Sequence, residues 1–493
     1  MSAPTSASGS SAEAGRVSPV AILLAVVAAT TLARLAAGAL IPLTEDEAYY
    51  RLWSMRPAFG YFDHPPMIAW WVWLGRHLAG DNPLGVRLIP TLGTAAANVA
   101  TFDVARRLGL GERIAARAGI WLNATLLVGF GGELAVPDAP NTLFWIVTLW
   151  CAVRAMDGRA AWWPAAGAAA GLACLSKYSA LFLAPGLLLW LALSAEGRRQ
   201  LRTPWPWIGA IVAAAIFAPN IAWNAGHGWM TFAKQFGRVR ADGFAPTFLG
   251  KFAIDQVVLL NPPIAVFVGL AIRRRAAWPL LAVSAPFAAY LVLHSLHDEV
   301  QGQWPAPLYP LLVIAAAAAA EDARGWRAGL RAAAAPVGLA ISAVLLVFLI
   351  LPADATLPFR DPLGPYRDWP GFSGQVERAR LAAGAAWIGA PTYGVAAQLA
   401  AAPQIHAAAT EIFQRERYTF ETPAERADFS RPGLVVVQAR NPAGALLPSC
   451  FGQVARLADV VRGAGKSATA YALYRVASPR RDIERLGCDV STR

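Results

Sequence analysis

Long apolar runs recur along the first 350 residues, and they constrain the fold more than any other feature. About 20 apolar residues in a helix cross the hydrocarbon core of a bilayer, so these runs predict about eleven membrane-spanning helices. Only 15% of the residues are charged, whereas soluble domains carry about 25%. The predicted spans are 18–40, 86–107, 114–131, 139–156, 161–174, 179–194, 205–223, 247–272, 277–293, 305–320 and 333–351.

Arginine clusters follow every second apolar run, and this spacing predicts the topology. Short loops rich in Lys and Arg stay on the cytoplasmic side of a membrane. The N-terminus is therefore expected inside, and everything after residue 352 outside. The net charge of +12 is explained by these loops, so nucleic acid is not expected as a partner. The clusters include Arg106 and Arg107, Arg198 and Arg199, and Arg273, Arg274 and Arg275.

Composition divides the chain into three parts. Residues 1–17 are rich in Ser and Ala and are predicted to be a disordered cytoplasmic segment. A signal peptide is disfavoured because the first apolar run exceeds the ~7–15 residues of such a peptide. Residues 18–352 form the membrane domain. Residues 353–493 contain strand-like and helix-like stretches such as GLVVVQA and QVERARLAAGAA, which predict a small α/β domain.

Two cysteines fall in the predicted outer domain. An oxidising compartment would allow Cys450 and Cys488 to form a disulfide. Two free thiols are an equally simple interpretation, and the sequence leaves the choice open.

The first outer loop, residues 41–85, concentrates carboxylates between aromatic residues and prolines. The stretch from Thr44 to Glu47 has the form of a capping box and predicts a helix start. Asp46 would lie in the first turn, where the helix dipole favours an ionised carboxylate that can act as a general base. Pro65 and Pro66 suit the start of a second helix rich in tryptophan. We expect two amphipathic helices that form a lid on the membrane surface.

Other ionisable residues also gather in the connections predicted to face outward. A lysine at the end of an apolar span, as in LSKYS, is costly unless it is paired or reaches toward the interface. This distribution predicts a site that opens to the outside and is assembled from several loops. The residues concerned are Asp63, His64, Arg87, Asp138, Lys177, His227, Arg238, Arg240 and His297.

Five motifs in order, DEAYY, GYFDHPPM, PDAP, LSKY and WPAPLYP, resemble glycosyltransferase family 39. This family includes the bacterial relatives of protein O-mannosyltransferases and the lipid A aminoarabinose transferases. The resemblance implies an all-α GT-C membrane fold and transfer of a sugar from a polyprenyl-phosphate donor. The expected acceptor is lipid A, another envelope glycan, a lipid or a protein, on the periplasmic side of a bacterial inner membrane.

The resemblance implies a role for Asp46, and the chemistry of the residues themselves suggests the other candidates. Asp46 corresponds to the presumed general base. The family's aminoarabinose transferases have Glu-Lys where this chain has Asp63 and His64, so the carboxylate is kept and the lysine is not. The acidic, metal or acceptor-site candidates are Glu47, Asp63 and Asp138. The candidates for binding the donor phosphate are Lys177, His64, Arg87, Arg238 and Arg240. A divalent metal ion would be held by Asp63 with His227 or His297.

A lipid or lipid-linked-sugar flippase without transferase activity is the main alternative. Transporters often show internal repeats and ionisable residues near the middle of spans. No repeat of the DEAYY or DHPP segment is present, and Asp103 is the main charge within a span. A non-catalytic assembly protein would leave the loop carboxylates and Lys177 unexplained. The sequence therefore favours the transferase.

Overall fold

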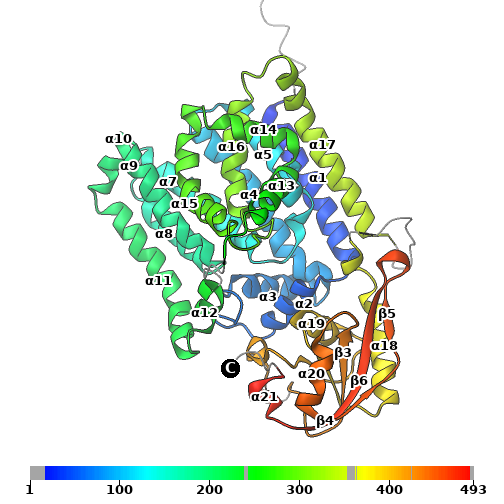
Figure 1. The fold of residues 1–493 in the computed structure, drawn as a ribbon. Helices are drawn as coiled ribbons and strands as arrows, with labels where there is room; N and C mark the ends of the chain where they lie inside the picture. Colours follow the sequence, from blue (N-terminus) through cyan, green and yellow to red (C-terminus); the bar gives the residue numbers. More distant parts are fainter. Residues whose placement is uncertain (1–16, 238–242, 352–360, 362, 423–424, 489–493) are drawn as a thin grey trace, which may run out of the picture.

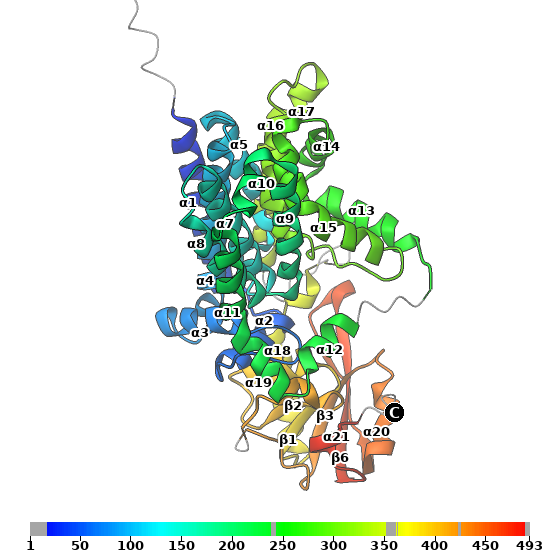
Figure 2. The same ribbon diagram turned by 90° about the vertical axis from the view of Figure 1, so that its left-hand side faces the viewer.

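The computed structural model describes residues 17–237, 243–351, 361, 363–422 and 425–488. The predicted disordered segment therefore lies, apart from Val17, outside the described residues. Figures 1 and 2 show a bundle of helices with a smaller α/β domain packed against one end. The first helix begins at the opposite end of the bundle from that domain, as Figure 2 shows. The placement of the two ends relative to a membrane stays a prediction.

Each of the eleven predicted apolar runs is helical over most of its length. Among the described residues, four helices are long and apolar enough to cross a membrane, or six with two bent pairs. The remaining runs form shorter or more polar helices, so the count of eleven spans stays a prediction. The bundle helices are α1 (Pro19–Leu40), α4 (Pro83–Arg107), α5 (Glu112–Ala124), α6 (Leu126–Gly129), α7 (Asp138–Met156), α8 (Trp162–Cys174), α9 (Leu183–Leu193), α10 (Ala195–Leu201), α11 (Trp205–Gly226), α12 (Met230–Gly237), α13 (Thr247–Leu259), α14 (Pro262–Ala271), α15 (Trp278–His294), α16 (Tyr309–Ala319) and α17 (Trp326–Leu349).

The eighth predicted span is not one continuous helix. The chain bends by 109° between α13 and α14, at Asn261, whose φ is +73°. Two prolines follow, and a proline suits the first turn of a helix because it has no N–H to donate. The Asn261 side chain donates to the carbonyl oxygens of Ala124 (3.2 Å) and Ala334 (2.7 Å), which fixes the bend against two other helices.

The two helices predicted for the first outer loop are present as α2 (Glu45–Ser54) and α3 (Met67–Ala79). The predicted capping box is formed. Thr44 Oγ1 accepts from the N–H of Glu47 at 3.1 Å, and Glu47 Oε2 accepts from the N–H of Thr44 at 2.9 Å. Trp53 stacks on Tyr61, with ring centroids 4.3 Å apart. This contact joins α2 to residues 61–66, which contain Pro65 and Pro66 and are called the proline turn below.

The C-terminal domain is a mixed sheet with the strand order β2-β1-β3-β6-β4, and β5 also pairs with β6. The predicted strands GLVVVQA and AYALYRV lie in the central strands β3 and β6. The predicted boundary at residue 352 lies outside the described residues. The strands are β1 (Trp387–Ala390), β2 (Ala409–Glu411), β3 (Gly433–Gln438), β4 (Phe451–Arg456), β5 (Val460–Arg462) and β6 (Thr469–Pro479), and the helices are α18 (Trp369–Ala382), α19 (Tyr393–Ala401), α20 (Ala443–Cys450) and α21 (Ile483–Leu486).

The two cysteines of this domain are neighbours but are free thiols. Both are buried, and Sγ of Cys450 lies 3.6 Å from the carbonyl oxygen of Cys488.

The lid and the C-terminal domain share one apolar core. Buried aromatic and aliphatic side chains of α2 and α3 pack in the same cluster as residues of α18, α19 and the central strands. Burial of apolar surface contributes roughly 25 cal/mol per Å2, so this shared core holds the lid to the domain. Its members include Tyr49, Trp53, Ile68, Phe372, Leu399 and Leu434.

The close packing of α8 on α11 gives a testable prediction. A Cβ added at Gly167 would lie 1.9 Å from the carbonyl oxygen of Gly209, which is backbone and must move. We expect Gly167→Ala to lower the free energy of unfolding by about 1–3 kcal/mol, the usual cost of overpacking. Gly250→Ala is the control, because no atom lies within 4 Å of its added Cβ. Thermal unfolding in detergent measures both, and equal midpoints would contradict the packing argument.

Candidate functional site

Two cavities meet beneath the lid. Their volumes are about 660 Å3 and about 450 Å3. Both are lined by Asp46, Val136, Asp138 and Gln303, so the cavities adjoin at these side chains. Two carboxylates therefore stand where the cavities join.

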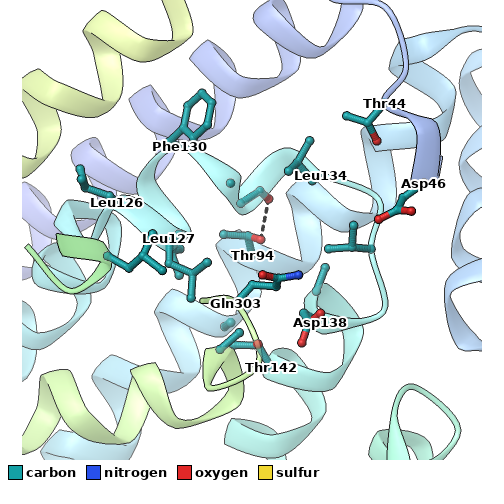
Figure 3. Close-up of a pocket in the computed structure, with 18 of the residues that line it drawn as sticks. Thr44, Asp46, Thr94, Leu126, Leu127, Phe130, Leu134, Asp138, Thr142 and Gln303 are labelled. Atoms are coloured by element: carbon teal, nitrogen blue, oxygen red, sulfur yellow. Dashed lines mark hydrogen bonds between the residues drawn. The ribbon is translucent and has the colours of Figure 1, made fainter. Parts of the chain in front are cut away.

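The larger cavity is mainly apolar. Figure 3 shows Asp46 and Asp138 on one side of it and Leu126 and Leu127 on the other. Thr94 lies between them and donates to the carbonyl oxygen of Gly132 at 2.7 Å. Other apolar lining residues include Leu122, Val128, Phe130, Leu134 and Leu259.

The smaller cavity is polar and rich in aromatic rings. It is lined by residues of several segments that sequence analysis predicted to face outward, including Asp63 of the first loop, Asp138 of the PDAP segment and Lys177 of the LSKY segment. The predicted convergence of Asp46, Asp63 and Lys177 on one cavity is therefore seen in the structure. The polar and charged side chains that line it include Asp46, Asp63, His64, Asp138, Lys177, Gln303, Tyr393 and Arg417.

Asp46 lies in the first turn of α2 and is partly buried. Its Oδ1 accepts a hydrogen bond from the Tyr393 hydroxyl at 2.7 Å. Burial raises the pKa of Asp46 above its ordinary value, although the Tyr393 hydrogen bond and the nearby Arg417 act in the opposite direction. A carboxylate with a raised pKa is a stronger proton acceptor in its ionised form, which suits a general base.

Asp63 forms an ion pair with a residue of the C-terminal domain. Arg417 Nη1 lies 2.6 Å from Asp63 Oδ2, and both side chains are largely buried. The Tyr49 hydroxyl lies 3.2 Å from the same oxygen and 2.7 Å from the carbonyl oxygen of Arg417. The proline turn is thus fixed to η6 (Arg415–Tyr418) of the outer domain.

Lys177 forms an ion pair with Asp138 in the wall of the polar cavity. Its Nζ lies 2.7 Å and 2.9 Å from the two carboxylate oxygens. The side chains are 14% and 10% exposed, respectively. Lys177 directly precedes η2 (Tyr178–Phe182) and is extended, with φ of −159°, and Asp138 begins α7. The LSKY and PDAP motifs therefore meet as one charged pair.

Arg87 and Glu47 have a structural role. The five N–H groups of Arg87 donate to both carboxylate oxygens of Glu47 and to the carbonyl oxygens of Gly38, Ile41 and Pro42. Both side chains are buried, and neither lines either cavity. The geometry gives no support to the predicted phosphate-binding role of Arg87 or to an acceptor-site role of Glu47.

The predicted metal site is not assembled. His227 stacks on Trp223 and its Nδ1 donates to the carbonyl oxygen of that residue, and His297 contacts the carbonyl oxygen of Gly243. Neither histidine lines the cavities. Among the described residues, no group of three or more His, Cys, Asp or Glu side chains is placed to hold a metal ion. Arg238 and Arg240 lie outside the described residues.

Sequence analysis missed three residues of the site. Gln303 lies directly before the WPAPLYP motif, so that motif was an available signal. Tyr393 and Arg417 belong to the C-terminal domain, about 350 residues from their partners. No local pattern in their segments distinguishes them from ordinary residues of a small α/β domain.

Comparison with known proteins supports the family resemblance that the sequence motifs indicated. Residues 63–223 match the family model described as dolichyl-phosphate-mannose-protein mannosyltransferase. The lipid A galacturonosyltransferase RgtD of Rhizobium johnstonii is 32% identical over 188 residues, 37% of this chain and 38% of that protein. An undecaprenyl phosphate-alpha-4-amino-4-deoxy-L-arabinose arabinosyl transferase of Pseudomonas fluorescens is 30% identical over 26% of this chain and 23% of that protein. The chain thus aligns with less than half the length of these relatives, and over that part the predicted family resemblance is confirmed.

A solved structure extends the likeness to the whole fold. The crystal structure of ArnT from Cupriavidus metallidurans bound to undecaprenyl phosphate matches 92% of this chain and 98% of that chain. The TM-score is 0.65 and the sequence identity is 15%. At that identity the match shows the fold, and it confirms the predicted GT-C membrane fold with a small C-terminal α/β domain.

Proposed function

We propose that this protein is a membrane glycosyltransferase that moves a sugar from a polyprenyl-phosphate donor to an envelope acceptor, with Asp46 as general base. The observation that carries the proposal is the position of Asp46 where a polar and an apolar cavity meet. The lipid A and arabinosyl transferases named above support the substrate class. We infer that the reaction takes place on the periplasmic side of a bacterial inner membrane, with the N-terminus in the cytoplasm.

Lys177 is the cation of the polar cavity that we assign to the phosphate that leaves during transfer. The bond between the sugar C1 and the phosphate oxygen breaks, and the acceptor oxygen forms the new glycosidic bond. Asp46 takes the proton of the acceptor hydroxyl, and the polyprenyl phosphate leaves as an anion. Lys177 lies in the same cavity and supplies positive charge for that anion, because such stabilisation is largely electrostatic. One carboxylate acting as a base gives inversion at C1.

The larger cavity suits a lipid portion of a substrate. Its wall contains leucine and phenylalanine side chains from α5, α6 and the following turn. Apolar chains bind such surfaces because their burial removes apolar area from water. An acceptor that carries acyl chains, such as lipid A, fits a site with this apolar neighbour.

Direct assay tests the proposal against the flippase alternative. The purified protein in nanodiscs is mixed with lipid A and polyprenyl-phosphate-linked galacturonic acid, aminoarabinose or mannose. Mass spectrometry is expected to show one glycosidic product and free polyprenyl phosphate. A protein that moves labelled polyprenyl-phosphate sugar across vesicles, yet gives no product with any donor, would establish the flippase instead.

Replacement of Lys177 tests its contact with the donor phosphate. We expect Lys177→Gln to lower kcat/KM for the donor about 10- to 100-fold, as for loss of one charge-assisted hydrogen bond. The variant also leaves Asp138 without its partner. The double variant Lys177→Gln with Asp138→Asn separates the two effects, because it removes the unpaired carboxylate as well.

Lys251→Gln is the control for this prediction. Lys251 is about half exposed and pairs with Glu299 at the surface, so its loss should leave donor kinetics unchanged. A double variant with the wild-type kcat/KM would contradict a role of Lys177 toward the phosphate.

A further inference from the structure

Two side chains of the C-terminal domain, Tyr393 and Arg417, contact each other and line the polar cavity. Tyr393 is the first residue of α19, and its hydroxyl donates to Asp46 at 2.7 Å. Arg417 lies over the Tyr393 ring, 4.5 Å from its centroid, and pairs with Asp63 at 2.6 Å. A chain of contacts therefore runs from the proline turn through the outer domain to the proposed base.

The surroundings hold Tyr393 in this position. A Cβ at the next residue, Gly394, would lie 2.3 Å from Glu45 Oε2, so α19 begins directly against the start of α2. The Tyr418 hydroxyl donates to the carbonyl oxygen of Tyr393 at 2.8 Å. Tyr393 also packs against Tyr49, with ring centroids 4.9 Å apart. Contacts on several sides leave the hydroxyl directed at Asp46.

We propose that Tyr393 is a positioning residue for Asp46, held in turn by Arg417, so that the C-terminal domain completes the site. This inference rests on the proposed function. A phenol that donates to one carboxylate oxygen fixes the orientation of the carboxylate and favours its ionised form. The second oxygen is then directed to accept the proton from the acceptor hydroxyl. The outer domain thus has a role in the reaction besides any contact with the acceptor.

Several charged or titratable groups surround Asp46 and set the background for its ionisation. Two of these groups, Arg417 and Lys177, are cationic. The carboxylates around Asp46 are more numerous than the cations. These groups are Glu45, Glu47 and Tyr50 on its own helix, Asp63, Tyr366, Tyr393 and Arg417 on the elements packed against it, and Asp138 and Lys177 in the wall of the same cavity.

The pH profile of Tyr393→Phe tests the inference, because the variant removes the hydroxyl and keeps the ring. Activity of an ionised base falls as pH decreases through its pKa. Loss of a hydrogen bond to the carboxylate raises that pKa, so the acid limb of kcat should move to higher pH by about one unit. Tyr474→Phe is the control, since Tyr474 lies in β6, away from the lining of both cavities. A merely structural role would lower the thermal midpoint and leave the acid limb in place.

A second variant tests the same inference if Tyr393→Phe does not fold. Arg417→Lys keeps the positive charge near Asp46 but removes the planar group over the Tyr393 ring. We expect a smaller shift of the acid limb in the same direction. If wild type transfers sugar and the acid limb is unchanged in the variants that fold, the inference is overturned and the proposed function stands. If wild type transfers no sugar from any donor, both are overturned.

Discussion

Replacement of Asp46 by Asn is expected to lower kcat for sugar transfer by about 10²- to 10⁴-fold, the range for loss of a general base. The amide keeps the shape of the carboxylate but cannot accept the acceptor proton. Asp46 stands where the two cavities meet, with its Oδ1 held by Tyr393, so loss of its charge acts on the reacting atoms and not on a remote contact. The product is measured by mass spectrometry with the donor at saturation.

A folded variant is essential to this test. Burial already disfavours the charged form of Asp46, so a neutral amide should leave the thermal midpoint unchanged or slightly higher. Asp157→Asn is the matched control, because this carboxylate is about half exposed. It lies just after the C-terminal end of α7, whereas Asp138 of the site lies at the N-terminal end of that helix. Transfer at the wild-type rate by folded Asp46→Asn would remove Asp46 from the mechanism.

The parts that sequence predicted well are those in which the signal lies within a short segment. Hydropathy located the apolar helices, and the capping box at Thr44 located the start of α2. The DEAYY, DHPP, PDAP and LSKY segments were assigned to one outward-facing site, and the structure brings Asp46, Asp63, Asp138 and Lys177 to one cavity. Loop position relative to the membrane was enough for that inference.

The parts that sequence missed depend on contacts between distant segments. Tyr393 and Arg417 acquire their roles from the packing of the outer domain on the lid, which no local pattern encodes. Arg87 illustrates the converse error. An arginine at the outer end of a span looks available to bind phosphate, yet the buried carboxylate of Glu47 and three carbonyl oxygens use all of its donors. Partners of this kind are visible only in three dimensions.

The second large effect is expected from Arg87→Met, through stability. Burial alone would raise the pKa of Glu47, but Arg87 and the N–H groups of Thr44 and Ala135 hold it below its usual value. Glu47 is therefore ionised at neutral pH, and loss of Arg87 leaves a buried charge unpaired. Breaking such a pair from one side costs about 3–5 kcal/mol. We expect the free energy of unfolding in detergent to fall by that amount at pH 7.

The pH dependence of that loss separates the ion pair from simple packing. A depressed folded-state pKa stabilises the protein above the unfolded pKa, and this stabilisation is lost as pH falls through the folded value. The deficit of Arg87→Met should therefore shrink toward acid pH, where Glu47 takes up a proton. The double variant Glu47→Gln with Arg87→Met should recover part of the stability at pH 7, because no charge remains buried. Arg106→Met, which removes a half-exposed partner of Asp103 in the same helix, should cost no more than about 1 kcal/mol. A deficit that is equal at acid and neutral pH, and unrelieved in the double variant, would assign the effect to packing of the Arg87 side chain.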